Sequence, residues 1–298
     1  MKGPANAGSF RFPGTMVGVM STDHDSPVPA RAPLDVARIR QDLIRPGRLW
    51  REVTVVASTG STNTDLAGRA AAGAPEGIVL AAEEQRQGRG RMGRRWLSPA
   101  RSALMVSVLL RPAEVAPARR GWVPLLAGVA AATAVRRVTG VPAVLKWPND
   151  LLVGDRKLAG ILAEQSGDAI VAGLGVNVST TRAELPEPTP GSLPATSLRL
   201  EDATSLDRSA LLIALLGQLE HWYQAWRRAG PPGDPGASGL RRAYLDLSAT
   251  VGRDVRVERP AGRVTAGRAT GLGADGQLIV EGPAGPEAVS AGDVRHLR

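Results

Sequence analysis

Hydrophobic side chains recur through much of the chain at the spacing of an amphipathic helix. Residues 34–45 and 207–228 repeat apolar positions about every 3.6 residues, which predicts a helix with one buried face in each. Residues 122–138 are Ala-rich and apolar nearly throughout, which predicts a buried helix. Capping and helix-ending residues bound a further helix at 63–73, and a short helix is predicted at 239–247.

Shorter apolar or alternating runs, each bounded by turn residues, predict strands. Before residue 250 these runs are 51–58, 77–84, 102–110, 143–147, 150–153, 157–164 and 169–178. The last four follow one another closely, as expected for an antiparallel meander. Because strands and helices do not alternate regularly, the pattern predicts an α+β fold.

The pattern changes at the two ends of the chain. From Thr250 onward, short β-like runs punctuated by Gly and Pro predict a small β-barrel of about fifty residues. Residues 1–33 are rich in Gly, Pro and Ser, which predicts a disordered leader. The expected domains are therefore a leader (1–33), a catalytic domain (34–248) and a C-terminal domain (249–298).

Composition excludes several kinds of site. The chain has no cysteine, and its three histidines lie far apart in sequence, which argues against disulfides, thiolate nucleophiles and Cys/His zinc sites. The longest apolar stretch, 123–135, is interrupted by Pro and Gly and is shorter than the roughly 18 residues of a membrane helix. No membrane span and no signal peptide are predicted, so a cytoplasmic location is expected.

Positive charge is concentrated in one segment. The net charge is +9, and six arginines but no acidic residue lie between Gln85 and Arg101. This distribution favours a local anion site over a broad basic face. Only three of the 37 basic residues are lysines, namely Lys2, Lys146 and Lys157. Since a guanidinium does not replace a compact ammonium at close range, the two internal lysines are candidate ligand contacts, and the less favoured alternative is a pair of surface lysines.

Residues 88–93 (GRGRMG) match the GxGxxG pattern of dinucleotide-binding proteins, but no helix is predicted to begin there, so this reading is rejected. No Walker loop is present. What remains is a glycine-rich loop whose backbone can approach an anion and whose arginines can grip phosphate, with Trp96 placed to stack on a base. The alternative is a solvated basic loop.

The segment KWPND (146–150) follows a predicted strand. The amide of Asn149 offers the donor and acceptor needed to read adenine, while Asp150 could accept a hydrogen bond or help to hold Mg²⁺. Seven residues later, Lys157 could stabilise charge that develops on a phosphate, and Gly160 would allow close ligand approach. A β-hairpin with polar ends is the alternative.

Two further polar groups stand out. Ser61, Thr62 and Asn63 begin a predicted helix, where they could cap it or bind a small polar ligand. Asn177 lies in an apolar strand, so its amide needs a partner that is either structural or a ligand.

Taken together and in this order, these motifs closely resemble those of biotin protein ligases. The segments are GSTN (60–63), EQRQGRGRMGRRW (84–96), KWPND (146–150), KLAGI (157–161) and GLGVN (173–177). The resemblance implies a catalytic domain with a mixed or antiparallel sheet like that of class II aminoacyl-tRNA synthetases, followed by an SH3-like barrel. It also implies that biotin and MgATP give biotinyl-5′-adenylate, from which biotin passes to a lysine of a biotin carboxyl carrier domain.

The resemblance carries over to particular residues. Those expected to contact biotin are Ser61, Thr62, Asn63, Gln85, Arg89, Gly90, Arg91, Lys157 and Gly160. Those expected to contact ATP are Arg91, Arg94, Trp96, Lys146, Asn149, Asp150, Lys157 and Asn177. The expected catalytic residues are Lys157, Arg89 and Arg91, while the ligands of Mg²⁺ and a possible homodimer are left open.

Two alternative functions follow from the same residues, and one departure from some family members is evident. A lipoate or octanoate ligase or transferase is the nearest, and the GRGRxGRxW loop argues against it. An arginine-rich nucleic-acid-binding protein is disfavoured, because charge in the C-terminal region is nearly balanced and aromatic residues are not clustered. Some family members also carry an N-terminal helix-turn-helix and repress transcription, but residues 1–50 predict a single helix, so no operator binding is expected.

Overall fold

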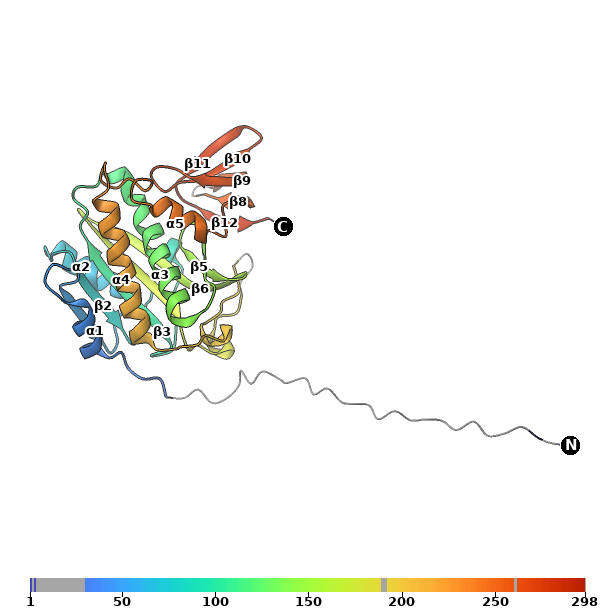
Figure 1. The fold of residues 1–298 in the computed structure, drawn as a ribbon, viewed down its shortest axis with the longest axis horizontal. Helices are drawn as coiled ribbons and strands as arrows, with labels where there is room; N and C mark the ends of the chain where they lie inside the picture. The colour runs from blue at the N-terminus through green and yellow to red at the C-terminus, as the bar shows by residue number, and fades with distance from the viewer. Residues whose placement is uncertain (2, 4–29, 189–191, 260–261, 298) are drawn as a thin grey trace.

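The computed structural model describes residues 1, 3, 30–188, 192–259 and 262–297 (Figure 1). Most of the predicted leader therefore lies outside the described residues. Among the residues that are described, no helix combines the length and the apolar character needed to cross a membrane.

The larger part of the fold is a seven-stranded mixed sheet with the order β1-β2-β3-β7-β6-β5-β4. Its strands are β1 (Glu52–Val56), β2 (Ile78–Ala82), β3 (Ala103–Leu110), β4 (Val144–Lys146), β5 (Asp150–Val153), β6 (Arg156–Ser166) and β7 (Ala169–Asn177). The predicted meander of β4 to β7 is confirmed, since each of these strands pairs antiparallel with the next. Only β1 and β2 run parallel, and the helix between them makes the crossover.

Helices cover both faces of this sheet, which explains why β2 and β3 are almost entirely apolar and buried. Alternate residues of β2 belong to two separate apolar clusters, Val79 to the main core and Leu80 to a smaller one under α2 (Thr62–Ala71). Such runs are typical of strands that are buried on both faces. The opposite layer contains the other helices: α1 (Val36–Leu43), α3 (Val123–Thr139), α4 (Arg208–Arg227) and α5 (Leu240–Leu247). Figure 1 shows α3 and α4 side by side across the sheet.

The C-terminal region forms a separate five-stranded antiparallel sheet with the order β11-β10-β9-β8-β12. Its strands are β8 (Asp254–Glu258), β9 (Val264–Leu272), β10 (Leu278–Gly282), β11 (Gly285–Val289) and β12 (Asp293–His296). Two buried tryptophans of the larger part hold it by donating indole hydrogens to its backbone. Trp122 donates to the carbonyl of Ala274 at 2.8 Å, and Trp147 to that of Gly276 at 3.1 Å.

The contact between the two sheets predicts a pH-dependent stability. Burial, aided by the charges of Lys146 and Arg253, lowers the pKa of His296 to about 4, and its ring lies 3.1 Å from the hydroxyl of Thr250. In the unfolded chain this pKa is about 6.5, so the unfolded state binds more protons between the two values. The free energy of unfolding should therefore fall as pH drops from about 6.5 towards 4. Thermal melts of His296→Gln should show a shallower fall, and an unchanged pH dependence would contradict this assignment.

Candidate functional site

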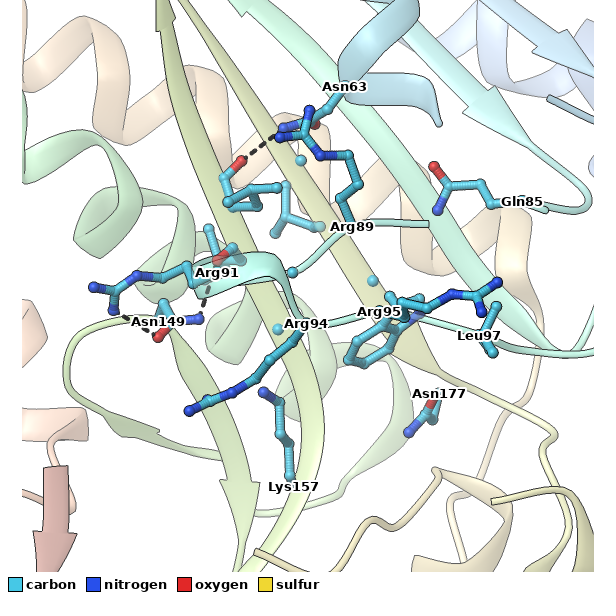
Figure 2. A pocket seen from close by; sticks show the side chains of 18 of the residues that line it. Asn63, Gln85, Arg89, Arg91, Arg94, Arg95, Leu97, Asn149, Lys157 and Asn177 are labelled. Atoms are coloured by element: carbon cyan, nitrogen blue, oxygen red, sulfur yellow. Dashed lines mark hydrogen bonds between the residues drawn. The ribbon is translucent and has the colours of Figure 1, made fainter. Parts of the chain in front are cut away.

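A cavity of about 280 Å³ opens on the main sheet beneath the arginine-rich loop (Figure 2). Its walls come from the start of α2, the loop between β2 and β3, strands β3, β6 and β7, the turn before β5, and the loop that follows β7. Every residue that the sequence singled out lines this cavity except Lys146 and Asp150. The residues brought together are Ser61, Thr62, Asn63, Gln85, Arg89, Gly90, Arg91, Arg94, Trp96, Asn149, Lys157, Gly160 and Asn177.

Glycines on neighbouring strands make the floor of the cavity hollow. Gly160 of β6 pairs with Gly175 of β7, and Gly173 lies two residues before Gly175 on β7. A Cβ atom at Gly175 would lie 2.6 Å from the indole ring of Trp96, and one at Gly173 only 2.1 Å from the amide oxygen of Asn63. Both side chains therefore pack directly on the backbone, which only glycine permits.

The start of α2 carries a polar network instead of a cap. Ser61 is the N-cap residue, yet its side chain makes no capping hydrogen bond. The backbone N–H of Thr62 instead donates to Oε1 of Gln85 at 2.8 Å. The hydroxyl groups of Thr62 and Ser107 lie 2.7 Å apart, and Ser107 donates to Oδ1 of Asn63 at 2.6 Å. These groups form a hydrogen-bonding surface at one end of the cavity, next to the apolar side chains of Ile161, Leu162 and Leu174.

The arginine loop is folded rather than free. After Gly90 it makes a single 3-10 turn, Arg91–Gly93, and Met92 takes a left-handed conformation with φ 56°. The next element is strand β3 and not an α-helix, as the sequence predicted for this loop. Side chains hold the loop at separate points: Arg91 donates to Oδ1 of Asn149 at 3.1 Å, and Arg94 pairs with Asp293 of β12. These contacts argue against a merely solvated loop.

Lys157 lies at the start of β6 with its backbone fixed on both sides. Its N–H donates to the carbonyl of Pro194 at 2.8 Å, and its own carbonyl accepts from the N–H of Thr196 at 2.9 Å. Its ammonium pairs with Asp150 at 2.7 Å. Asp150 thus lies behind Lys157 rather than in the cavity lining. Lys146 is opposite Asp150 in the β4–β5 pair, and burial lowers its pKa while Asp150 opposes that effect.

Amide groups line the other end of the cavity. Asn177 donates to the carbonyl of Thr196 at 2.9 Å, which is a structural partner for its amide hydrogens. Asn149 donates to the carbonyl of Ile161 at 3.2 Å while accepting from Arg91. The indole N–H of Trp96 is buried without a hydrogen-bond partner.

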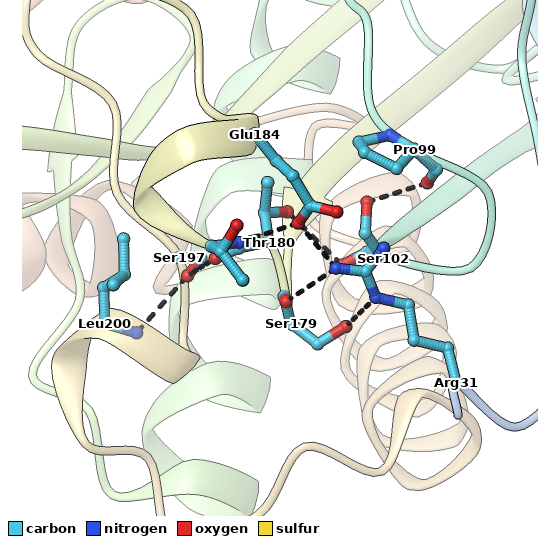
Figure 3. A network of polar contacts seen from close by, with 9 residues as sticks. Arg31, Pro99, Ser102, Ser179, Thr180, Glu184, Ser197 and Leu200 are labelled. Carbon is cyan, nitrogen blue, oxygen red and sulfur yellow. Dashed lines mark hydrogen bonds and ion pairs between the residues drawn. The ribbon is translucent and has the colours of Figure 1, made fainter. Parts of the chain in front are cut away.

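The loop after β7, which lines the Asn177 end of the cavity, is held by a residue that precedes α1 (Figure 3). Arg31 donates to both oxygens of Ser179 at 3.1 Å and pairs with Glu184 at 2.6 Å. Burial raises the pKa of Glu184, but the bond from Arg31 helps to bring it below its usual value. The segment before α1 therefore anchors the loop after β7.

Several further residues line the cavity that the sequence analysis had assigned no individual ligand contact, although some of them belong to its motifs. Ser107 interrupts the apolar run of β3, and that interruption was a usable signal. The others come from β6, β7, the end of the arginine loop and the loop after β7: Arg95, Leu97, Ile161, Leu162, Gly173, Leu174, Gly175, Pro186, Glu187, Ser192, Leu193 and Ala195.

The lining suits an anionic ligand with a small polar head group. Among the described residues of the lining, the cations are Arg89, Arg91, Arg94, Arg95 and Lys157, and the single acid is Glu187. Among the described residues, no group of three or more His, Cys, Asp or Glu is placed to hold a metal ion. A divalent cation here would need ligands from its substrate as well as from the protein.

Comparisons with known proteins agree with this geometry. Residues 55–180 match the biotin/lipoate A/B protein ligase family, and residues 250–297 match the biotin protein ligase C-terminal domain. A biotin–acetyl-CoA-carboxylase ligase of Mycobacterium tuberculosis is 41% identical over 281 residues, covering 93% of this chain and 100% of that protein. The bifunctional ligase/repressor BirA of Bacillus subtilis is 27% identical, covering 80% of this chain and 71% of that protein.

A solved structure is similar as well. The biotin protein ligase of Aquifex aeolicus in complex with biotin and ATP superposes with a TM-score of 0.68 at 25% identity, covering 84% of this chain and all of that one.

Proposed function

The chain belongs to the biotin protein ligase family, and we propose that its cavity joins biotin to AMP and then passes biotin to a lysine of a carboxyl carrier domain. The observation that carries this proposal is the lining of one cavity, which has hydrogen-bonding groups at one end, apolar side chains beside them, and arginines with Lys157 at the other end.

The polar end suits the cyclic urea of biotin. Oε1 of Gln85 is occupied by the N–H of Thr62, so its amide hydrogens are free to donate to a urea carbonyl. Oδ1 of Asn63 accepts from Ser107 and retains a lone pair for a urea N–H. The apolar side chains of Ile161, Leu162 and Leu174 line the cavity next to these groups and would contact the hydrocarbon chain.

The cationic end suits ATP. Trp96 and Asn177 line the region proposed for adenine, while Arg91, Arg94 and Lys157 face the region proposed for the phosphates. Mg²⁺ would arrive with the triphosphate, since Mg²⁺ keeps several waters and takes only one or two protein carboxylates. Asp150 is the carboxylate that we consider for Mg²⁺. Because it forms an ion pair with Lys157, we propose that its main role is to position that lysine.

The reaction then needs two displacements. The biotin carboxylate attacks the α-phosphorus of ATP and pyrophosphate leaves, while Lys157 and Arg91 stabilise the growing charge. The neutral amine of the carrier lysine next attacks the mixed anhydride, and AMP leaves as the amide forms. The arginine loop would exclude water, which would otherwise hydrolyse the adenylate.

A lipoate or octanoate ligase is the second candidate, because residues 55–180 match a family that includes lipoate ligases as well as biotin ligases. The hydrogen-bonding surface made by Thr62, Asn63 and Ser107 favours biotin, since an octanoyl chain has no head group to pair with it.

The proposal is tested by incubating the enzyme with biotin, MgATP and an apo carrier domain. Mass spectrometry should show one added biotin on the carrier and none on a carrier whose acceptor lysine is changed to arginine. Unmodified carrier under conditions that support a known ligase would contradict the proposed transfer.

We also propose that this protein does not bind an operator. Among residues 30–50, α1 is the only helix. A gel shift with the promoter regions of biotin genes should show no biotin-dependent specific complex. A retarded band that requires both biotin and ATP, and that competes only with the same sequence, would refute this.

We also propose two finer features of the fold. The C-terminal sheet is proposed to be an SH3-like barrel beginning near residue 249, and the larger sheet to be related to class II aminoacyl-tRNA synthetases. The five antiparallel strands and the mixed sheet support these assignments. A cytoplasmic location is proposed because biotin carriers and ATP are found there, while a homodimer is left to measurement.

A further inference from the structure

Glu164, near the end of β6, contacts two residues that line the cavity although it does not line the cavity itself. Its Oε2 accepts a hydrogen bond from Nδ2 of Asn63 at 2.9 Å, and its Oε1 lies 3.1 Å from the guanidinium of Arg89. One carboxylate therefore joins the start of α2 to the arginine loop. No sequence motif singled it out.

The contact with Asn63 determines which way its amide points. One amide hydrogen goes to the carbonyl of Leu162 at 3.1 Å and the other to Glu164. A carbonyl and a carboxylate can only accept hydrogen bonds, so a flipped amide would place its oxygen against two acceptors. The carboxylate of Glu164 therefore helps to keep Oδ1 of Asn63 on the side of Ser107 and the cavity.

This orientation sets the donors and acceptors that a ligand meets. Ser107 gives its hydrogen to Oδ1 of Asn63, so its oxygen is left to accept from Thr62 or a ligand. The same Oδ1 is the only acceptor of Asn63 left for a ligand N–H. Reversing the amide would replace this acceptor with a donor and reverse the hydrogen bond to Ser107.

We propose that Glu164 is a positioning residue that determines specificity for the head group of the acid. It holds Asn63 as an acceptor for a urea N–H and holds Arg89 over the same end of the cavity. The inference rests on the proposed function, because it assumes that the head group is the urea of biotin.

The contact with Arg89 is the weaker of the two. The side chain of Arg89 is 55% exposed, and exposed ion pairs contribute little because water screens them. The main effect of Glu164 is therefore expected through Asn63, which is buried at 4% exposure.

The variant Glu164→Gln tests the contacts with Asn63 and Arg89 without removing the packing of the side chain. The new amide keeps the size of the side chain but can donate as well as accept, so it no longer favours one orientation of Asn63. We expect the KM for biotin to rise about tenfold, while the KM for ATP and kcat at saturating biotin stay within about twofold. A purely structural role would instead lower the melting temperature and change both KM values together.

A matched control is Glu52→Gln. Glu52 on β1 also accepts from an arginine, Arg69, at 2.8 Å and 2.9 Å, but it lies outside the cavity lining. This variant should leave the KM for biotin unchanged. If both variants raise it equally, the effect is not specific to Glu164 and the inference fails.

A head-group analogue tests the proposed cause. Wild-type enzyme should bind biotin more tightly than a biotin methylated on its urea nitrogen, and Glu164→Gln should narrow that difference at least about threefold, as measured by titration calorimetry without ATP. If Glu164→Gln prefers biotin over the methylated analogue as strongly as the wild type does, the inference about Glu164 fails while the proposed function stands. Absence of any biotin binding by the wild-type enzyme would overturn the proposed function instead.

Discussion

Replacing Lys157 with alanine is expected to slow biotin-dependent ATP–pyrophosphate exchange by about 10²–10³-fold while the fold survives. The ammonium lies at the edge of the cavity, 2.7 Å from Asp150, and its backbone is held by Pro194 and Thr196. A preorganised charge in this position stabilises the α-phosphate as it becomes five-coordinate. Its removal leaves the neighbouring backbone hydrogen bonds intact, so the melting temperature should change little.

Two comparisons make this prediction specific. Arg242→Ala removes a basic side chain that is 83% exposed on α5 and pairs only with Asp246, so it should exchange like the wild type. Lys157→Arg keeps the charge but not the compact ammonium, and should remain at least about tenfold slower than the wild type. If Lys157→Ala catalysed ATP–pyrophosphate exchange at the wild-type rate, the catalytic charge would have to belong to another residue.

Replacing Gly175 with alanine is expected to cost about a hundredfold in the same exchange reaction, because the new methyl group displaces Trp96. The added Cβ would lie 2.6 Å from the indole ring, a distance that real Cβ contacts do not reach. The ring must move into the cavity or lift the arginine loop. Overpacking of this kind also lowers the free energy of unfolding by about 1–3 kcal/mol.

Gly217→Ala is the matched control for this change. Gly217 lies within α4, where an added Cβ meets nothing within 4 Å. Alanine in a helix interior stabilises by about 0.5–1 kcal/mol relative to glycine, so this variant should melt slightly higher and exchange normally. If Gly175→Ala exchanged as fast as Gly217→Ala, the proposed seat of Trp96 on β7 would be wrong.

Elements with strong periodicity were predicted closely from the sequence. The helix expected at 207–228 spans Arg208–Arg227, and the strand expected at 150–153 is β5 with the same bounds. Local signals of this kind depend on neighbouring residues alone. The parallel pairing of β1 with β2 and the strand order of the C-terminal sheet depend on contacts distant in sequence, and no local pattern encodes them.

The residues of the site also fall into those that local sequence predicts and those that only distant contacts reveal. Motif residues such as Asn63, Arg91 and Lys157 were predicted because the chemistry of each is visible in its own segment. Glu164 was missed because its role arises only when β6 is brought beside α2. The β4–β5 pairing likewise places Lys146 and Asp150 behind Lys157, which sequence spacing could not reveal.

The central claim is that the cavity adenylates biotin, and ATP–pyrophosphate exchange measured side by side with biotin, lipoate and octanoate tests it most directly. Radiolabelled pyrophosphate should enter ATP only when biotin is present, because only a reversibly formed acyl-adenylate allows the exchange. Biotin should support exchange, with lipoate and octanoate at background. Exchange with lipoate or octanoate but not with biotin would contradict the account.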